Sequence, residues 1–254
     1  MRVKSKKGER VQGGMRSLMS LLCPWVVAAV CACAPNRDAP ARDSGAAAPV
    51  SKSSPAPAPG AAAANQVRSL LFVGTSLTAG LGLDPDSAYP ALIQRKIDSA
   101  GLPFSVTNAG VSGETTAGLL ERLDWILRGT FDVLVLETGA NDGLRGIPAA
   151  SVRANIQAAL SRIAASRPNA RVVLVQMEVL PNLGPRYAAE FHAVYPEVAK
   201  TSHVTLMPFL LDGVAGRANL NQGDGIHPND VGERIVAANV WRTLEPVLRE
   251  AARR

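Results

Sequence analysis

Cysteine and histidine are both scarce in this chain, and the shortage excludes several kinds of chemistry. The three cysteines all precede residue 34: Cys23, Cys31 and Cys33. From residue 65 onward the chain therefore has no disulfide, no thiol nucleophile and no cysteine ligand for zinc. The three histidines are scattered and do not cluster with carboxylates: His192, His203 and His227. We expect no metal site and no cofactor.

An excess of positive charge is also absent from most of the chain, although the formal net charge is +6. Residues 1–65 hold 9 of the 27 Lys and Arg side chains but only 3 of the 21 Asp and Glu side chains. Residues 66–254 therefore carry 18 charges of each sign. Nucleic acids bind to basic surfaces, so we expect no nucleic-acid partner for this balanced part.

The N-terminal segment, residues 1–33, has the pattern of an export signal. Basic residues precede an apolar run at 18–32 of about 15 residues, whereas a transmembrane helix needs roughly 20. Val30-Cys31-Ala32-Cys33 resembles the lipobox of bacterial lipoproteins, in which cleavage leaves the last cysteine as a lipidated N-terminus. The resemblance predicts a lipid on Cys33 and an exported protein, either periplasmic or anchored to a membrane. An ordinary cleaved signal with incidental cysteines is the alternative.

Residues 34–65 are rich in Ala, Pro, Ser and Gly. Such a segment cannot bury enough apolar surface to offset the entropy lost on ordering, and its prolines favour an extended spacer. We predict a disordered tether between the N-terminal anchor and one folded domain at residues 66–254. We expect this protein to act as a monomer.

From residue 67 the pattern alternates between apolar strands and helices. Strands are predicted at 69–73, 104–108, 131–137, 171–177 and 203–207, and helices at 89–100, 115–128, 148–166, 187–200 and 228–250. Repeated βα units with continuously apolar strands indicate a parallel sheet covered on both faces. Right-handed crossovers then favour a three-layer α/β/α fold with a flavodoxin-like, five-stranded parallel sheet. Thr115 or Thr116 is a candidate cap for the second helix, and Trp125 is predicted to pack against the core.

Ser76 follows the first strand at the turn Gly74-Thr75-Ser76, where α/β folds place their chemistry. A serine hydroxyl is a weak nucleophile until a base takes its proton. His227 is a candidate base, and Asp224 in the same loop can orient its ring and stabilise the imidazolium. Taken alone, each feature also has a structural explanation, because Ser76 suits a turn and the Asp224–His227 pair suits a helix-entry turn.

Two further loops are candidates for an oxyanion hole. Gly113 lies after the second strand and Asn141 after the third. The N–H groups of Ser76 and Gly113 and the side-chain amide of Asn141 can donate to a developing negative charge. A turn glycine and an Asx-turn residue are the structural alternatives. Because the carboxyl ends of parallel strands lie at one rim of a sheet, we expect these loops and the Asp224–His227 loop to meet.

Four blocks at these positions resemble the GDSL or SGNH hydrolases. The blocks are Gly74-Thr75-Ser76-Leu77, Ser112-Gly113-Glu114-Thr115, Gly139-Ala140-Asn141-Asp142 and Asp224-Gly225-Ile226-His227-Pro228. Within that family the likeness is nearest to the bacterial multifunctional thioesterase, arylesterase and lysophospholipase group, and it covers residues 70–247. The resemblance implies the SGNH hydrolase fold.

The resemblance also implies roles for individual residues. Ser76 takes the place of the nucleophile, with Asp224 and His227 as its partners. The oxyanion donors would be Ser76, Gly113 and Asn141. Thr75 stands where the family usually has an aspartate, which we expect to alter local hydrogen bonds without abolishing the chemistry.

The implied substrates are short- or medium-chain acyl esters, aryl esters and lysophospholipids, with thioesters as a side activity. Residues 178–187 resemble a loop on the substrate side of the multifunctional group, and an ordinary βα connection is the alternative. Deacetylation of carbohydrate or peptidoglycan esters on the same fold is a second candidate function. A non-catalytic, tethered binding module is a third, although the intact set of candidate catalytic residues argues against it.

Overall fold

The computed structural model describes residues 67–253. They contain a five-stranded parallel sheet with the strand order β2-β1-β3-β4-β5, which is the flavodoxin-like order. The strands are β1 (Arg68–Gly74), β2 (Phe104–Gly110), β3 (Val133–Leu136), β4 (Arg171–Val175) and β5 (Thr205–Met207). The predicted sheet is therefore confirmed. The export signal, the lipid on Cys33 and the tether stay predictions, because residues 1–66 lie outside the described part.

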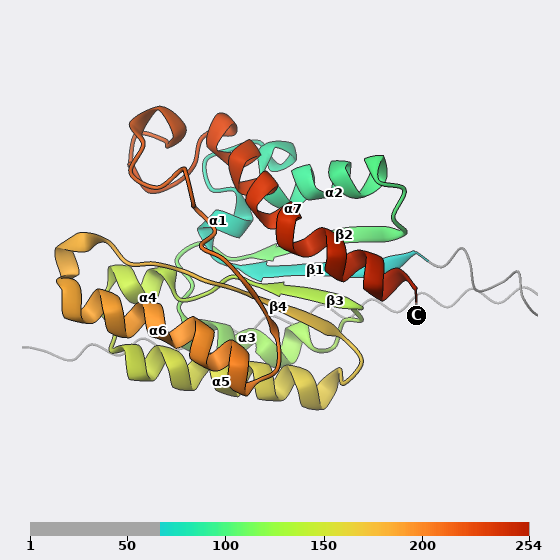
Figure 1. Cartoon of the computed structure of the whole chain (residues 1–254), viewed down its shortest axis with the longest axis horizontal. Coiled ribbons are helices and arrows are strands. Elements are labelled where there is room, and N and C mark those ends of the chain that lie inside the picture. The colour runs from blue at the N-terminus through green and yellow to red at the C-terminus, as the bar shows by residue number, and fades with distance from the viewer. Residues whose placement is uncertain (1–66, 254) are drawn as a thin grey trace, which may run out of the picture. The chain divides into compact units, whose positions relative to one another are not determined.

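Helices cover both faces of the sheet, which confirms the three-layer fold (Figure 1). On one face α2 and α7 pack together, and on the other α5 packs between α3 and α6. These helices are α2 (Tyr89–Ser99), α3 (Thr116–Ile126), α5 (Ala149–Ser166), α6 (Pro185–Thr201) and α7 (Asp230–Ala252). Short helices lie in the connections: α1 (Ser76–Ala79), α4 (Ala140–Leu144), and the 3-10 helices η1 (Pro85–Ser87), η2 (Pro181–Leu183) and η3 (Ala218–Leu220).

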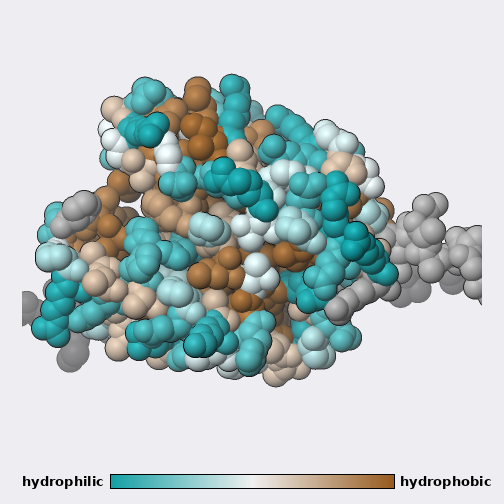
Figure 2. Space-filling model, viewed as in Figure 1, coloured by the Kyte–Doolittle hydropathy of each residue, from teal (hydrophilic) through white to brown (hydrophobic). Residues whose placement is uncertain are grey.

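The central strands are closed off from solvent on both faces. Phe72 in β1 and all four residues of β3 are fully buried, as are Ile93 in α2 and Ile156 in α5. Each such side chain stabilises the fold by about 1.5–3 kcal/mol relative to its exposed state. Hydrophilic residues cover much of the face shown in Figure 2, with hydrophobic residues visible between them. The sheet is thus a rigid support for the loops at its carboxyl edge.

Differences between the predicted and observed elements have local causes. Helix α7 begins at Asp230 because Asn229 caps it, with Oδ1 accepting the N–H groups of Val231 at 3.0 Å and of Gly232 at 3.1 Å. β5 begins at Thr205 because His203 adopts a left-handed φ of 54° where α6 ends. The cap of α3 is Thr115, whose side chain accepts the N–H of Gly118.

The prediction for Trp125 is wrong. Its side chain is 62% exposed, whereas Leu119, Leu123 and Ile126 of the same helix are buried. Position 125 therefore lies on the outer face of α3. None of the helices within residues 67–253 combines the length and the apolar composition needed to cross a membrane.

Candidate active site

The candidate site lies where the connections of the sheet diverge. β1 lies between β2 and β3, so the chain leaving β1 runs to one side of the sheet and the chain leaving β3 runs to the other. In open α/β sheets such a switch point opens a crevice beyond the carboxyl ends of the strands, and ligands bind there. Ser76 follows β1 and Asn141 follows β3, so both are at this crevice.

A tight turn between β1 and α1 presents Ser76. Thr75 is the N-cap of α1, and Gly80 ends the helix in a left-handed conformation with a φ of 71°. Gly74 is required by close packing, because a Cβ at this position would lie 2.0 Å from Oγ1 of Thr78. The turn leaves Ser76 only 8% exposed, at the base of a pocket rather than on an open surface.

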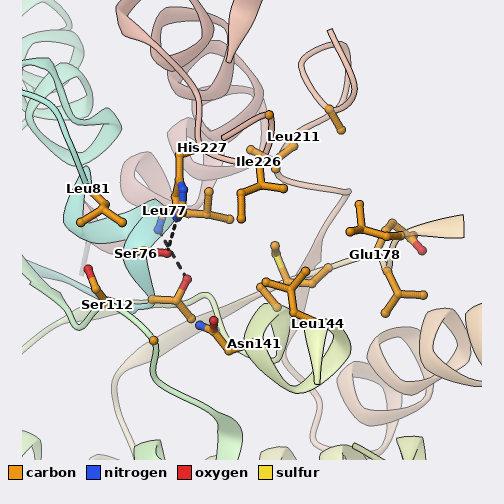
Figure 3. A pocket seen from close by; sticks show the side chains of 18 of the residues that line it. Ser76, Leu77, Leu81, Ser112, Asn141, Leu144, Glu178, Leu211, Ile226 and His227 are labelled. Atoms are coloured by element: carbon orange, nitrogen blue, oxygen red, sulfur yellow. Dashed lines mark hydrogen bonds between the residues drawn. The ribbon is translucent and has the colours of Figure 1, made fainter. Parts of the chain in front are cut away.

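His227 and Asp224 come to Ser76 from the loop before α7 (Figure 3). Nε2 of His227 lies 2.8 Å from Oγ of Ser76, and Nδ1 lies 2.6 Å from Oδ2 of Asp224. The other carboxylate oxygen, Oδ1, accepts the N–H groups of Ile226 and His227, each at 3.0 Å. The three predicted residues, separated by up to 151 positions, therefore form one hydrogen-bonded chain.

The hydrogen bonds also assign the protons. The N–H of Ile226 and then the ring and N–H of His227 lower the pKa of Asp224 to about 2, so its carboxyl group is ionised at neutral pH. An ionised carboxylate only accepts hydrogen bonds, so Nδ1 of His227 carries the hydrogen between them. With the hydrogen on Nδ1, Nε2 is free to accept the hydroxyl of Ser76. This is the arrangement that general-base activation of a serine requires.

Gln222 links the loop that carries His227 to the segment that follows Ser76. Its N–H donates to the carbonyl of His227 at 2.7 Å. Its Nε2 donates to the carbonyls of Leu81 at 2.7 Å and of Pro228 at 2.9 Å. Leu81 follows Gly80, the C-cap of α1, so the side chain of Gln222 joins the loop that carries His227 to the segment after Ser76.

The candidate oxyanion donors have hydrogens that no protein acceptor takes up within the described residues. The N–H groups of Ser76 and Gly113 have no acceptor within residues 67–253. Nδ2 of Asn141 donates one hydrogen to the carbonyl of Glu114 at 3.0 Å, which orients the amide and leaves its second hydrogen for a ligand. All three residues line the same pocket. The structure thus brings together every candidate residue that the sequence analysis named for the site.

A buried carboxyl group lies beneath the turn that carries Ser76, and the sequence analysis gave it no role. Oε2 of Glu137 accepts the N–H of Thr75 at 2.7 Å and the hydroxyl of Thr78 at 3.0 Å. Burial raises the pKa of Glu137, and the hydrogen bonds from Thr75 and Thr78 oppose that rise. Asp142 has a comparable role beneath Asn141, because it accepts the N–H and hydroxyl of Thr116 and so joins α4 to α3. Glu137 lies two residues before the block Gly139-Ala140-Asn141-Asp142, and Asp142 is the last residue of that block.

The pocket beside Ser76 is largely apolar, with a cavity volume of about 550 Å³. Its hydrophobic lining includes Leu77, Leu81, Leu144, Met177, Val179, Leu180, Phe209, Leu211 and Ile226. Residues 178–180 of the predicted substrate-side loop contribute to this wall, and η2 follows them. Within the described part of the chain, no three His, Cys, Asp or Glu side chains are arranged to hold a metal ion.

Comparisons with known proteins find a family of lipases and acylhydrolases and several esterases. A family model described as the GDSL-like Lipase/Acylhydrolase family matches residues 72–235. The chain is 40% identical to an esterase, TesA, from Pseudomonas aeruginosa, over 71% of this chain and 90% of that protein. It is 36% identical to an arylesterase of Vibrio mimicus, over 72% of this chain and 91% of that protein.

Two further similarities agree with these. The chain is 36% identical to thioesterase 1/protease 1/lysophospholipase L1 of Escherichia coli K12, over 70% of this chain and 84% of that protein. Among solved structures, a crystal structure of TesA superposes with a TM-score of 0.68 at 39% identity, covering 71% of this chain and 99% of the other.

Proposed function

Because the chain belongs to the GDSL-like lipase/acylhydrolase family and is a carboxylic ester hydrolase, we propose that Ser76, His227 and Asp224 are its catalytic triad. The observation that carries this proposal is the 2.8 Å contact between Nε2 of His227 and Oγ of Ser76, with Asp224 bonded to the other ring nitrogen. A serine needs such a base to become a nucleophile at neutral pH.

In the proposed reaction, Oγ of Ser76 attacks the ester carbonyl carbon while Nε2 of His227 takes the hydroxyl proton. The charge that develops on the carbonyl oxygen is stabilised by the N–H groups of Ser76 and Gly113 and by Nδ2 of Asn141. Asp224 stabilises the imidazolium, which then gives its proton to the departing alcohol. Water, activated by the same imidazole, releases the acyl group from Ser76.

The apolar pocket supports an acyl chain as the group held beside Ser76. Its volume of about 550 Å³ is within the range of pockets that enclose small organic ligands. Each methylene buried contributes about 0.8 kcal/mol, so kcat/KM should rise up to roughly fourfold per added methylene until the pocket is filled. We therefore propose short- and medium-chain acyl esters, aryl esters and lysophospholipids as substrates. Thioesters are a side activity, since an exported enzyme meets little coenzyme A.

The test is turnover of p-nitrophenyl acyl esters, from acetate to dodecanoate, by the full-length protein and by Ser76→Ala. The substitution should lower kcat by a factor on the order of 10⁶. Ser112→Ala is the matched control, because Ser112 lines the same pocket without a proposed role, and it should keep activity within a few-fold. Activity that survives Ser76→Ala would refute the nucleophile, and no activity in either protein would favour a binding module.

The same chain-length series separates the proposal from carbohydrate or peptidoglycan deacetylation. A deacetylase would prefer acetate, gain nothing from longer chains and act on O-acetylated sugars. The leucine-rich wall formed by residues such as Leu77, Leu144 and Leu180 supports the opposite order of preference.

We further propose that the protein is exported and held at a membrane by a lipid on Cys33, and that it acts as a monomer. Cys33→Ala should move the protein from the membrane fraction to the soluble fraction, whereas Cys31→Ala should not. The intact mass of the native protein should include the acyl groups. A full-length, unmodified mass would instead indicate an uncleaved N-terminus, and light scattering would report the monomer.

A further inference from the structure

One charged side chain in the pocket has no part in the proposed reaction. Glu178 is the only Asp, Glu, Lys or Arg among the residues that line the cavity beside Ser76. It follows the end of β4, on a segment whose next two residues, Val179 and Leu180, continue the apolar wall. A carboxylate beside aliphatic side chains loses hydration, and that loss costs free energy unless the carboxylate is hydrogen-bonded.

Glu178 and Ser76 lie at opposite ends of the pocket (Figure 3). Leu144 lies between them in this view, and Ile226 covers the pocket from the loop that carries His227. An acyl group bonded to Ser76 that extends along these side chains therefore points its far end toward Glu178.

The carboxylate is fixed rather than free to move away. Its Oε1 accepts a hydrogen bond from Nε2 of Gln176 at 2.7 Å and lies 2.7 Å from Nδ1 of His192. The second oxygen, Oε2, has no partner within residues 67–253. The side chain is 31% exposed, so its charge is only partly screened by solvent. One oxygen thus anchors the group beside the pocket, and the other has no hydrogen-bond partner among the described residues.

We propose that Glu178 is a specificity-determining residue that excludes acyl groups with an anion at their far end. This inference rests on the proposed function, because it requires the acyl chain to occupy the pocket from Ser76 toward Glu178. Like charges at the far end repel, and an anion would also lose hydration in an apolar pocket without gaining a donor. Neutral acyl groups avoid this cost, and a cationic end is attracted. The substrate class is therefore acyl esters with neutral or cationic chain ends.

The test compares p-nitrophenyl monoesters of adipic, suberic and sebacic acids with the same compounds capped as methyl esters. Assays at about pH 8.5 are above the range in which histidine side chains usually change charge. The ratio of kcat/KM for the capped substrate to that for the acid should be greatest at the length that reaches Glu178. Glu178→Gln should lower that ratio by roughly 5- to 30-fold, the size of a charge–charge repulsion in a partly hydrated site.

Glu190→Gln is the matched control. Glu190 lies on α6 in an ion pair with Arg186 and does not line the pocket, so its substitution removes the same charge from a nearby surface. The ratio should stay at the wild-type value in this variant. A p-nitrophenyl ester with a trimethylammonium group at the chain end should lose kcat/KM in Glu178→Gln and not in Glu190→Gln.

An unchanged ratio in Glu178→Gln, or an equal fall in Glu190→Gln, would overturn the inference. Glu178→Ala gives the same readout if the glutamine variant does not fold. Failure of the proposed function is distinguishable, because it appears as turnover of the neutral capped esters by Ser76→Ala. If only this inference fails, turnover of the capped esters still depends on Ser76, but the ratio of kcat/KM for capped substrate to acid is the same in Glu178→Gln as in wild type.

Discussion

The hydroxyl of Thr75 donates to the buried carboxyl group of Glu137, with Oγ1 2.9 Å from Oε2. The N–H of Thr75 donates to the same oxygen at 2.7 Å. Thr75 directly precedes Ser76, so Glu137 holds the backbone that carries the proposed nucleophile. At the position where the family usually has an aspartate, a threonine thus supplies the donor that a buried acceptor needs. Glu137 does not line the pocket, so we expect it to position Ser76 rather than to contact a substrate.

Thr75→Val keeps the shape of the side chain and removes this donor. An under-satisfied buried carboxyl group costs about 1–3 kcal/mol, so the free energy of unfolding should fall by that amount. Urea denaturation measures it, and kcat should fall because the turn loses one of its restraints. Thr75→Ser keeps the hydroxyl and should retain most of both quantities. If valine and serine were equally tolerated, the hydrogen bond would have no part in holding the turn.

Asn141→Ala tests the proposed oxyanion donor. Loss of one such donor lowers kcat by a factor on the order of 10² to 10³, with a small effect on KM, because the interaction strengthens only as charge develops. Stopped-flow or steady-state kinetics with p-nitrophenyl butyrate gives the two parameters separately. Asn219→Ala is the control, since Asn219 is exposed and does not line the pocket. A rise in KM at unchanged kcat would assign Asn141 to substrate binding instead.

Gln222→Ala should loosen the spacing between the loops that carry Ser76 and His227. Misplacement of a catalytic group by about 1 Å costs up to roughly 100-fold, so kcat should fall about 10- to 100-fold while KM changes less. Gln94→Ala is a matched control, because Gln94 also joins two elements through Nε2 and Oε1, with Phe104 and Val106, but lies away from the site. Both variants should lose some stability. An equal loss of kcat in both would mean that Gln222 acts only through stability.

The sheet and the candidate site could be predicted from the sequence for a physical reason. Continuously apolar runs such as 133–136 identify strands buried on both faces, and the parallel order brings their carboxyl ends together. The short helices α1 and α4 were missed because four or five residues cannot display a helical period. Trp125 was misplaced because one large apolar side chain says nothing about which face of a helix it occupies.

The roles of the polar side chains that support the site were harder to predict from the sequence. The contact between Gln222 and Leu81 joins positions 141 residues apart, and no local pattern marks it. Glu137 follows an apolar strand, where a solvent-facing acid and a buried one have the same sequence signature. The inferred role of Glu178 depends on the pocket that it lines, which the sequence does not show. Such groups depend on tertiary contacts, which propensity and periodicity do not encode.

Glu233 makes stability depend on pH in a way that can be isolated. It is buried in α7, where Oε2 accepts the N–H of Tyr89 at 2.7 Å. Burial raises the pKa of Glu233 from 4.5 to about 8, Asp230 adds to the rise, and the N–H of Tyr89 opposes it. Between about pH 4.5 and 8 the folded protein therefore holds a proton that the unfolded chain releases. The free energy of unfolding should then fall as pH rises, by up to about 1.4 kcal/mol per pH unit.

Glu233→Gln keeps an acceptor for the N–H of Tyr89 but has no titrating group. As the pH rises from 5 to 8, the free energy of unfolding should therefore fall more in wild type than in the variant. Urea denaturation at each pH gives the two curves. Glu137 contributes to both curves equally, and the pKa of Asp224, at about 2, lies below this window. Glu245→Gln, which removes a partly exposed carboxylate from the same helix, should leave the curve parallel to that of wild type. Parallel curves for Glu233→Gln would mean that Glu233 is ionised in the folded protein throughout, and that its burial is compensated by a partner other than Tyr89.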